Sequence, residues 1–309
     1  MTNQGGGGSS CLKTGCLVLV GCFGLGVMII ALVAGLAWMK AQSSRPEAQV
    51  LTRPVEPAPP VPPSALSADL PARETTVGGR VVLDLSEAEF VIEPGPAGEP
   101  IRIEATYDRA TATLEEIFEP GTSGNWTYTV RFDRDAGFLT KLFEGLADKS
   151  PKVRVLVPPD VPIDLEMGIS QGEARVRLGG LWLTSAAIDF SMGGMELSID
   201  EPLREPVESF SIRGSVGGGA FRSLGNASPR RLDVVASMGG MGLDLTGRWL
   251  RDAQITIDQS MGGMGVRLPD DVVIEGIDHP RAKREQSKEV PLPVLRFTVS
   301  SANGEVEFN

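Results

Sequence analysis

The residues that most often carry enzyme chemistry are few in this chain and lie far apart. The single histidine, His279, stands beside Pro280, so its count excludes a multi-histidine zinc site, and this residue is the one histidine that a charge-relay triad could use. The three cysteines, Cys11, Cys16 and Cys22, all lie near the N-terminus. The rest of the chain therefore offers neither a thiol nucleophile nor a disulfide.

Two pairs of adjacent carboxylates, Asp270–Asp271 and Glu115–Glu116, are the remaining candidates for acid–base catalysis. Neighbouring residues of a strand point to opposite faces, so neither pair is by its spacing a matched acid and base. The glycine run at 5–8 lacks the lysine of a phosphate-binding loop. We expect solvated charges at turns, and a protein that is not an enzyme and has no cofactor.

Methionines recur in pairs and allow two interpretations. Soft thioethers close together could bind Cu(I). Flexible methionine side chains also fill irregular gaps in narrow protein cores, and this is the role that we expect here. The residues concerned are Met192, Met195, Met238, Met241, Met261 and Met264.

Composition and charge restrict the class of partner. The 309-residue chain has a formal net charge of −11 and no long basic run, which argues against nucleic-acid binding. Its 41% hydrophobic and 22% charged residues suit a protein with a buried core. Glycine is abundant, with 37 residues, and its regular placement late in the chain indicates many tight turns.

The N-terminal region predicts a membrane anchor. After a short tail at 1–14, residues 15–39 contain no charge, and such a helix would span a bilayer, with Trp38 and Lys40 at the interface. Lipidation at Cys22 and cleavage as a signal peptide are the alternatives. The flanking charges lean slightly towards a cytoplasmic C-terminus. We nevertheless expect a single-pass protein of the bacterial cytoplasmic membrane with its C-terminal domain outside the cytoplasm.

A proline-rich linker is predicted at 40–75. Six prolines crowd 54–63, where aromatic and β-branched residues are scarce. Such a segment favours an extended polyproline conformation and would act as a spacer between anchor and domain. Recognition of this proline run by a partner is the less favoured alternative.

Period-two patterns in the remaining chain, 76–309, predict an all-β domain. Apolar and polar residues alternate over 80–85, 101–105, 126–132 and 152–157, as in half-buried strands. The apolar residues of 138–146 instead have helical spacing, which predicts one short helix.

An internal repeat dominates residues 152–309. Ser191-Met-Gly-Gly-Met195 recurs from Ser237 and from Ser260, and the first five copies start 21, 24, 22 and 23 residues apart. The positions predicted to form the repeated corners are Ser170, Gly172, Ser191, Gly193, Gly194, Ser215, Gly217, Gly218, Ser237, Gly239, Gly240, Ser260, Gly262, Gly263, Ser301 and Gly304.

This period favours a single-domain β-solenoid of stacked coils, in which equivalent residues form ladders. A β-sandwich is the competing architecture, but it gives no reason for near-equal spacings. The predicted fold class is therefore all-β, a β-solenoid with one short helix, preceded by one transmembrane helix.

At these residues the chain resembles the bacterial adhesin-like "toast-rack" domains. The resemblance lies in Val153–Pro158, Asp160–Leu165, the serine–glycine repeat and Met264–Val272. It implies a membrane-linked β-solenoid related to the C-terminal domain of proteins that respond to cell-wall-active antibiotics, and it implies no catalytic residues.

The expected function is non-enzymatic binding or scaffolding in the cell envelope. The expected partners are the lipid bilayer, through the N-terminal helix, and an envelope protein or the cell wall; homo-oligomer formation is left open. The alternative is a regulatory component of an envelope-stress response that acts through other membrane proteins. Glycines of the anchor, such as Gly21 and Gly24, would permit close helix approach in that case.

Overall fold

Six long strands that lie parallel to one another form most of the structure. The computed structural model describes residues 47–53, 78–121, 124–134, 150–280 and 291–309. Within them the chain is all-β, as predicted, and the 3-10 helix η2 (Leu224–Ala227) is a short exception. The long strands are β8 (Ile163–Arg177), β9 (Leu183–Ser198), β10 (Ser209–Arg222), β11 (Arg231–Asp244), β12 (Ala253–Arg267) and β14 (Val294–Phe308).

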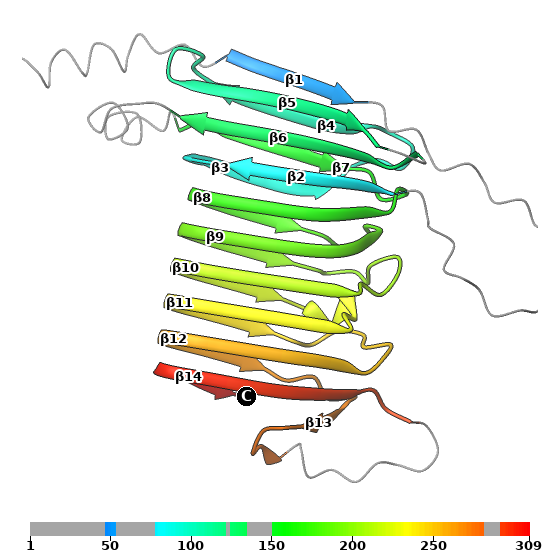
Figure 1. Cartoon of the computed structure of the whole chain (residues 1–309), viewed down its shortest axis with the longest axis vertical. Coiled ribbons are helices and arrows are strands. Elements are labelled where there is room, and N and C mark those ends of the chain that lie inside the picture. The colour runs from blue at the N-terminus through cyan, green and yellow to red at the C-terminus, as the bar shows by residue number, and fades with distance from the viewer. Residues whose placement is uncertain (1–46, 54–77, 122–123, 135–149, 281–290) are drawn as a thin grey trace, which may run out of the picture. The chain divides into compact units, whose positions relative to one another are not determined.

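Each long strand bends in its middle, so that its two halves lie in two facing layers (Figure 1). The pattern of buried and exposed side chains shows at which residues each strand bends. In β9, Phe190 and Met195 both point inward although they are five residues apart, because four corner residues between them reset the alternation. We call the layer of first halves layer 1 and the layer of second halves layer 2.

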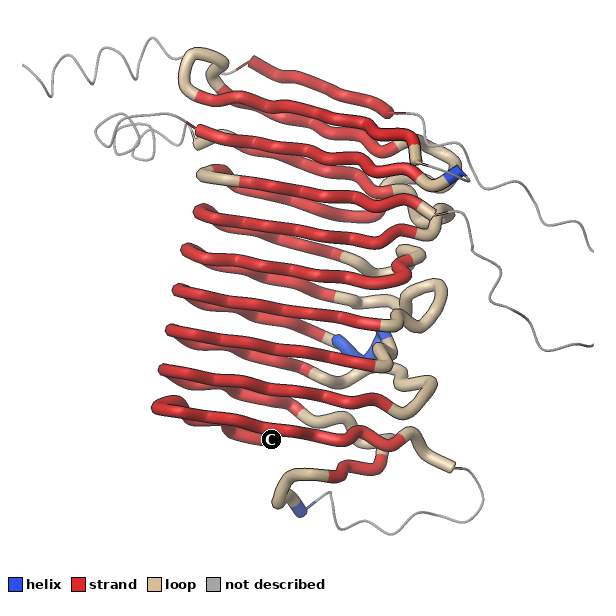
Figure 2. The backbone as a smooth tube through the Cα atoms, in the orientation of Figure 1, coloured by secondary structure: helices blue, strands red, loops and turns tan. Residues whose placement is uncertain are grey.

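The long strands pair in parallel with almost unbroken register, one above the next, as the coils of a β-solenoid do. Ile188 of β9 pairs with Ile212 of β10, which occupies the same place as Val234 of β11 and Ile257 of β12. From β8 to β12, consecutive strands thus differ by one repeat length, whereas β14 follows β12 at 42 residues; each long strand forms a rung of the stack (Figure 2).

Two further rungs precede β8, and each is made of two separate strands. The two halves of β8 pair with β2 (Gly79–Leu85) and β3 (Ala88–Pro94), respectively. These strands pair in turn with β6 (Trp126–Arg134) and β7 (Lys152–Val157). The strands predicted at 80–85, 126–132 and 152–157 are thereby confirmed.

Antiparallel strands close the N-terminal end of the stack. The strand β4 (Ile101–Tyr107) pairs with β7, and β5 (Ala112–Pro120) pairs with β6. The strand β1 (Glu47–Arg53) pairs antiparallel with β4. It lies inside the linker predicted at 40–75, which is a correction: residues 47–53 contain no proline, and Leu51 packs against the core.

The interruption of the repeat before its last copy corresponds to an irregular strand order at the C-terminal end of the stack. The short strand β13 (Val273–Glu275) follows β12 in the chain, but it lies beyond β14 and pairs only with the start of β14. The last long strand is therefore inserted between β12 and β13.

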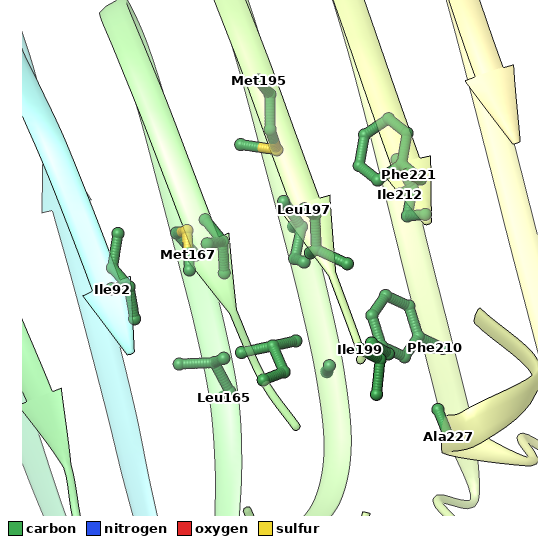
Figure 3. Close-up of a cluster of buried hydrophobic side chains, with 14 of the residues drawn as sticks. Ile92, Leu165, Met167, Met195, Leu197, Ile199, Phe210, Ile212, Phe221 and Ala227 are labelled. Carbon is green, nitrogen blue, oxygen red and sulfur yellow. The ribbon is translucent and has the colours of Figure 1, made fainter. Parts of the chain in front are cut away.

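Apolar side chains from both layers fill the space between them (Figure 3). Small residues make room for large ones at particular places in this core. Gly214 and Gly219 of β10 leave room for Phe190 and Phe221, because a Cβ at either glycine would lie 2.6 or 2.5 Å from a ring carbon. The two rings lie 5.9 Å apart between centroids.

Within the residues that the structure describes, no helix is both long and apolar enough to cross a membrane. The tail at 1–14, the predicted anchor at 15–39, the proline run of the linker and the short helix expected at 138–146 lie outside those residues.

Candidate interaction surface

The first glycine of each repeat is required by the fold. These residues have φ between +103° and +131°, which is accessible to glycine and strained for other residues. A Cβ would also lie 1.9–2.2 Å from a backbone oxygen of the preceding rung. They form a ladder down one edge of the stack: Gly172, Gly193, Gly217, Gly239 and Gly262.

The second glycine of each complete repeat is not required in this way. A Cβ at Gly194, Gly240 or Gly263 would meet no atom within 4 Å, and the φ of each is ordinary for any residue. Their recurrence in three repeats therefore has no explanation in the packing of the chain itself.

The methionines divide into two sets. Met195, Met241 and Met264 are 2–6% exposed and pack in the core. Met192, Met238 and Met261 are 46–49% exposed, so the expectation that all six fill the core is wrong for this half. The four-residue corner turns the first methionine of each pair outward and the second inward. A Cu(I) site could use only the outward set.

The outward methionines belong to one row of stacked residues, which we call the outer ladder. In order along the stack, it consists of Gln171, Met192, Val216, Met238, Met261 and Asn303. Its four central members are among the seven large apolar side chains that are exposed in the described part of the chain. Its terminal members are amides, and none of the six is charged, so this is an apolar stripe with polar ends.

A strip almost without side chains adjoins the outer ladder on the outer face of layer 2. We call it the glycine floor; it consists of Gly194, Gly218, Gly240, Gly263, Ala220, Gly242 and Gly265. A hollow of about 430 Å³ lies over its first rungs.

Charged side chains border the glycine floor. Glu196 pairs with Arg175 at 3.7 Å and also with Arg222, and Glu173 lies at the N-terminal end of the hollow. On the rung after the floor, Glu305 stacks on Gly263. The bare strip is thus framed by ion pairs and carboxylates, with the apolar ladder along its remaining side.

The predicted serines line the same corners, with one difference in register. Ser170, Ser191, Ser215, Ser237 and Ser260 lie between paired neighbours on successive rungs, and Ser191 Oγ donates to the carbonyl of Ser170 at 2.7 Å. Ser301 instead pairs with Gln259, and Gly304 with Gly262. The corner of the last repeat therefore has the same length as that of β12, and the expected equivalence of Ser301 with the other serines is wrong by one residue, because Ala302 lies opposite Ser260.

The other candidates for chemistry are scattered. Glu116 accepts a hydrogen bond from the Tyr128 hydroxyl at 2.8 Å on the outer rungs, whereas Asp270–Asp271 follow β12 at the opposite end. In the described part of the chain, no three His, Cys, Asp or Glu side chains are grouped as metal ligands.

A second hollow, of about 480 Å³, collects four arginines near the loop edge of layer 1. Most of them have structural partners. Arg230 pairs with Glu208 at 3.5 Å, Arg251 donates to the carbonyl of Ser228 at 3.1 Å, and Arg296 pairs with Asp252 at 3.3 Å. Ion pairs and a backbone hydrogen bond thus engage three of these four arginines.

Comparisons with known proteins identify no family. No family model matches the chain, and no curated protein matches it. Among solved structures, it is similar to a candidate cell adhesion protein from Clostridium sporogenes, with 11% identity and a TM-score of 0.42 over 85% of this chain and 99% of the other. The fold assignment therefore rests on the strand pairing of the chain itself.

Proposed function

We propose that this protein is a membrane-anchored binding or scaffolding module of the cell envelope, and that the outer ladder with the glycine floor is its binding surface. The β-solenoid is the rigid support, the proline-rich linker is the spacer, and the domain lies outside the cytoplasm. The proposal requires no reacting group.

One observation carries the proposal. Three of the repeats carry an exposed methionine and a second glycine that the fold does not use. On the rungs before and after the patch, the same two positions hold Gln171 with Glu173, and Asn303 with Glu305. An apolar strip with polar boundaries is typical of a protein interaction site.

A photo-cross-linking amino acid in place of Val216 tests the binding surface in intact cells. We expect adducts with an envelope protein, with the cell wall or with another copy of the chain. The same amino acid at Thr256, exposed on the outer face of layer 1, should give far fewer. Equal yields from the two positions, or none from Val216, would refute the proposed surface.

A reporter that is active only outside the cytoplasm, fused after Asn309, tests the location. Activity of this reporter is expected. A silent reporter, together with an active cytoplasmic one, would contradict the proposed envelope location and leave the binding surface to be explained inside the cell.

A further inference from the structure

We infer that two copies of this chain pair edge to edge through their outer ladders, about a two-fold axis that runs along the stack. The inference rests on the proposed function, because it names the partner of the proposed surface as a second copy of the chain. In this arrangement Met192, Val216, Met238 and Met261 each meet the same residue of the other copy.

The outer ladder is suited to pairing with itself. An interface around a two-fold axis brings a surface against its own copy, so any charge near the axis meets its like. The ladder contains no charge. Its terminal residues, Gln171 and Asn303, carry amides, and an amide both donates and accepts hydrogen bonds, so each can bond to its own counterpart.

The rows of residues on either side of the outer ladder determine whether the two-fold axis runs along the stack or across it. On the layer 1 side, the exposed residues next to the corner include Asp189, Arg213 and Asp258, while on the layer 2 side the corresponding rungs carry Gly194, Gly218 and Gly263. An axis along the stack places layer 1 of each copy beside layer 2 of the other. Each charged side chain then meets a bare glycine.

The opposite arrangement, with the two stacks antiparallel, brings layer 1 against layer 1. With the four apolar rungs centred on one another, Asp189 of one copy then faces Asp258 of the other, and like charges across an interface are unfavourable. The parallel arrangement also brings the β1 ends of both copies to the same end of the dimer. Two chains held in one bilayer by the predicted anchor need this orientation.

The size of the contact predicts a weak dimer. Six rungs spaced by about 4.8 Å give a seam about 24 Å long. With a width of about 10 Å, the total buried area is on the order of 500 Å², well below the roughly 1,200 Å² of specific stable interfaces. We therefore expect pairing where a membrane confines the chains and raises their effective concentration, and monomers in dilute detergent.

Disulfide trapping in membranes tests the pairing on the full chain. Cys11, Cys16 and Cys22 are replaced by serine, and a single cysteine is introduced as Met238→Cys, with Thr256→Cys as the matched control. A disulfide requires Cα atoms within about 7 Å, so mild oxidation should give about tenfold more linked dimer for Met238→Cys. Equal linkage of the two variants would overturn the pairing, and so would no linkage of Met238→Cys.

Charge at the seam gives a second measurement. In the Met238→Cys background, Val216→Glu should lower the linked dimer about tenfold, because two carboxylates then face each other, whereas the uncharged Val216→Thr should keep it. Val216 is exposed, so both variants should fold, and equal thermal midpoints check this. Unchanged linkage in Val216→Glu would overturn the inference.

The two proposals fail separately. If cross-links from position 216 reach only other envelope components and Met238→Cys does not link, the pairing is wrong and the proposed binding surface stands. If position 216 gives no adduct of any kind in cells, both are wrong.

Discussion

The substitution Gly239→Ala should destabilise the protein strongly, while Gly240→Ala, one residue further, should not. Gly239 has φ +121°, and a Cβ there would lie 1.9 Å from the carbonyl oxygen of Gly217 on the neighbouring rung. Backbone strain of this kind costs about 1–3 kcal/mol. Relief of a clash in a packed sheet adds about 1–3 kcal/mol. The expected loss is thus about 2–6 kcal/mol, out of the total of roughly 5–15 kcal/mol typical of a domain.

The adjacent glycine is the matched control, because it shares the corner without sharing the constraint. A Cβ at Gly240 would meet nothing within 4 Å, so the free energy of unfolding should change by no more than about 0.5 kcal/mol. Urea unfolding, followed by the fluorescence of Trp126, Trp182 and Trp249, measures both variants. The reasoning about the corner is refuted if the two variants unfold at the same urea concentration.

Three further substitutions test the packing and the surface charges, each by the same urea unfolding. Met195→Ala should cost about 2–5 kcal/mol because it empties a core position, whereas Met192→Ala, at an exposed one, should change stability by at most about 0.5 kcal/mol; equal losses would contradict the inward and outward assignment. Gly214→Ala should cost about 1–3 kcal/mol by its clash with the Phe190 ring, and part of that loss should disappear when Phe190→Leu is added; strictly additive losses would refute the contact. Arg154→Gln should cost about 1 kcal/mol, and less in about 1 M salt, because the Arg154 side chain is half exposed while its partner Glu93, which keeps Arg177, is only 14% exposed. The pKa of Arg154 is raised, first by the hydrogen bond from its guanidinium to Glu93, so on the alkaline side this contribution is lost only when the pH rises through that raised pKa; a loss near neutral pH would contradict the assignment.

The stacked architecture could be predicted from the sequence because the length of the repeat is the number of residues from one rung to the next. The five rungs from β8 to β12 need a glycine at the same corner, so near-equal spacings and a recurring glycine predict parallel, in-register strands. The strands at 152–157 and 126–132 were also predictable, since period-two alternation reports burial of one face.

The repeat alone did not predict that the first methionine of each pair is exposed and the second is buried. The direction of a side chain depends on how many residues the corner uses, and a four-residue corner reverses the alternation between Met192 and Met195. The position of Ser301 has a different cause. The last corner has the same length as the one before it, but the serine lies one residue earlier in the chain, so Ala302 takes the place of Ser260 and Ser301 pairs with the buried Gln259.

Of the antiparallel strands at the N-terminal end, β4 was predicted by the alternation over 101–105, whereas β1 and β5 were missed. The pairing of β1 with a distant segment leaves no signal in the sequence of β1 itself. The strand β1 has only seven residues and pairs with β4 more than forty residues later, across the proline run. Its backbone bonds to β4 and the packing of Leu51 define it, and composition carries neither.

The strands at the two ends of the stack carry exposed carboxylates, whereas the outer ladder along its edge carries no charge, and this difference affects how copies of the chain associate. In the described part of the chain, the second half of β14 is paired only with β12, and Glu305 and Glu307 project from this open strand. At the other end, β5 is paired only with β6 and exposes Glu115 and Glu119. Carboxylates on an open strand oppose the addition of a further strand, because like charges would meet across the new pairing. These carboxylates oppose end-to-end addition at β14 and at β5, whereas β1, the other open strand of the N-terminal end, pairs only with β4 and exposes Val50. The outer ladder is uncharged along its whole length, so the pairing that we infer is sideways, and its two-fold axis would close the contact after two copies.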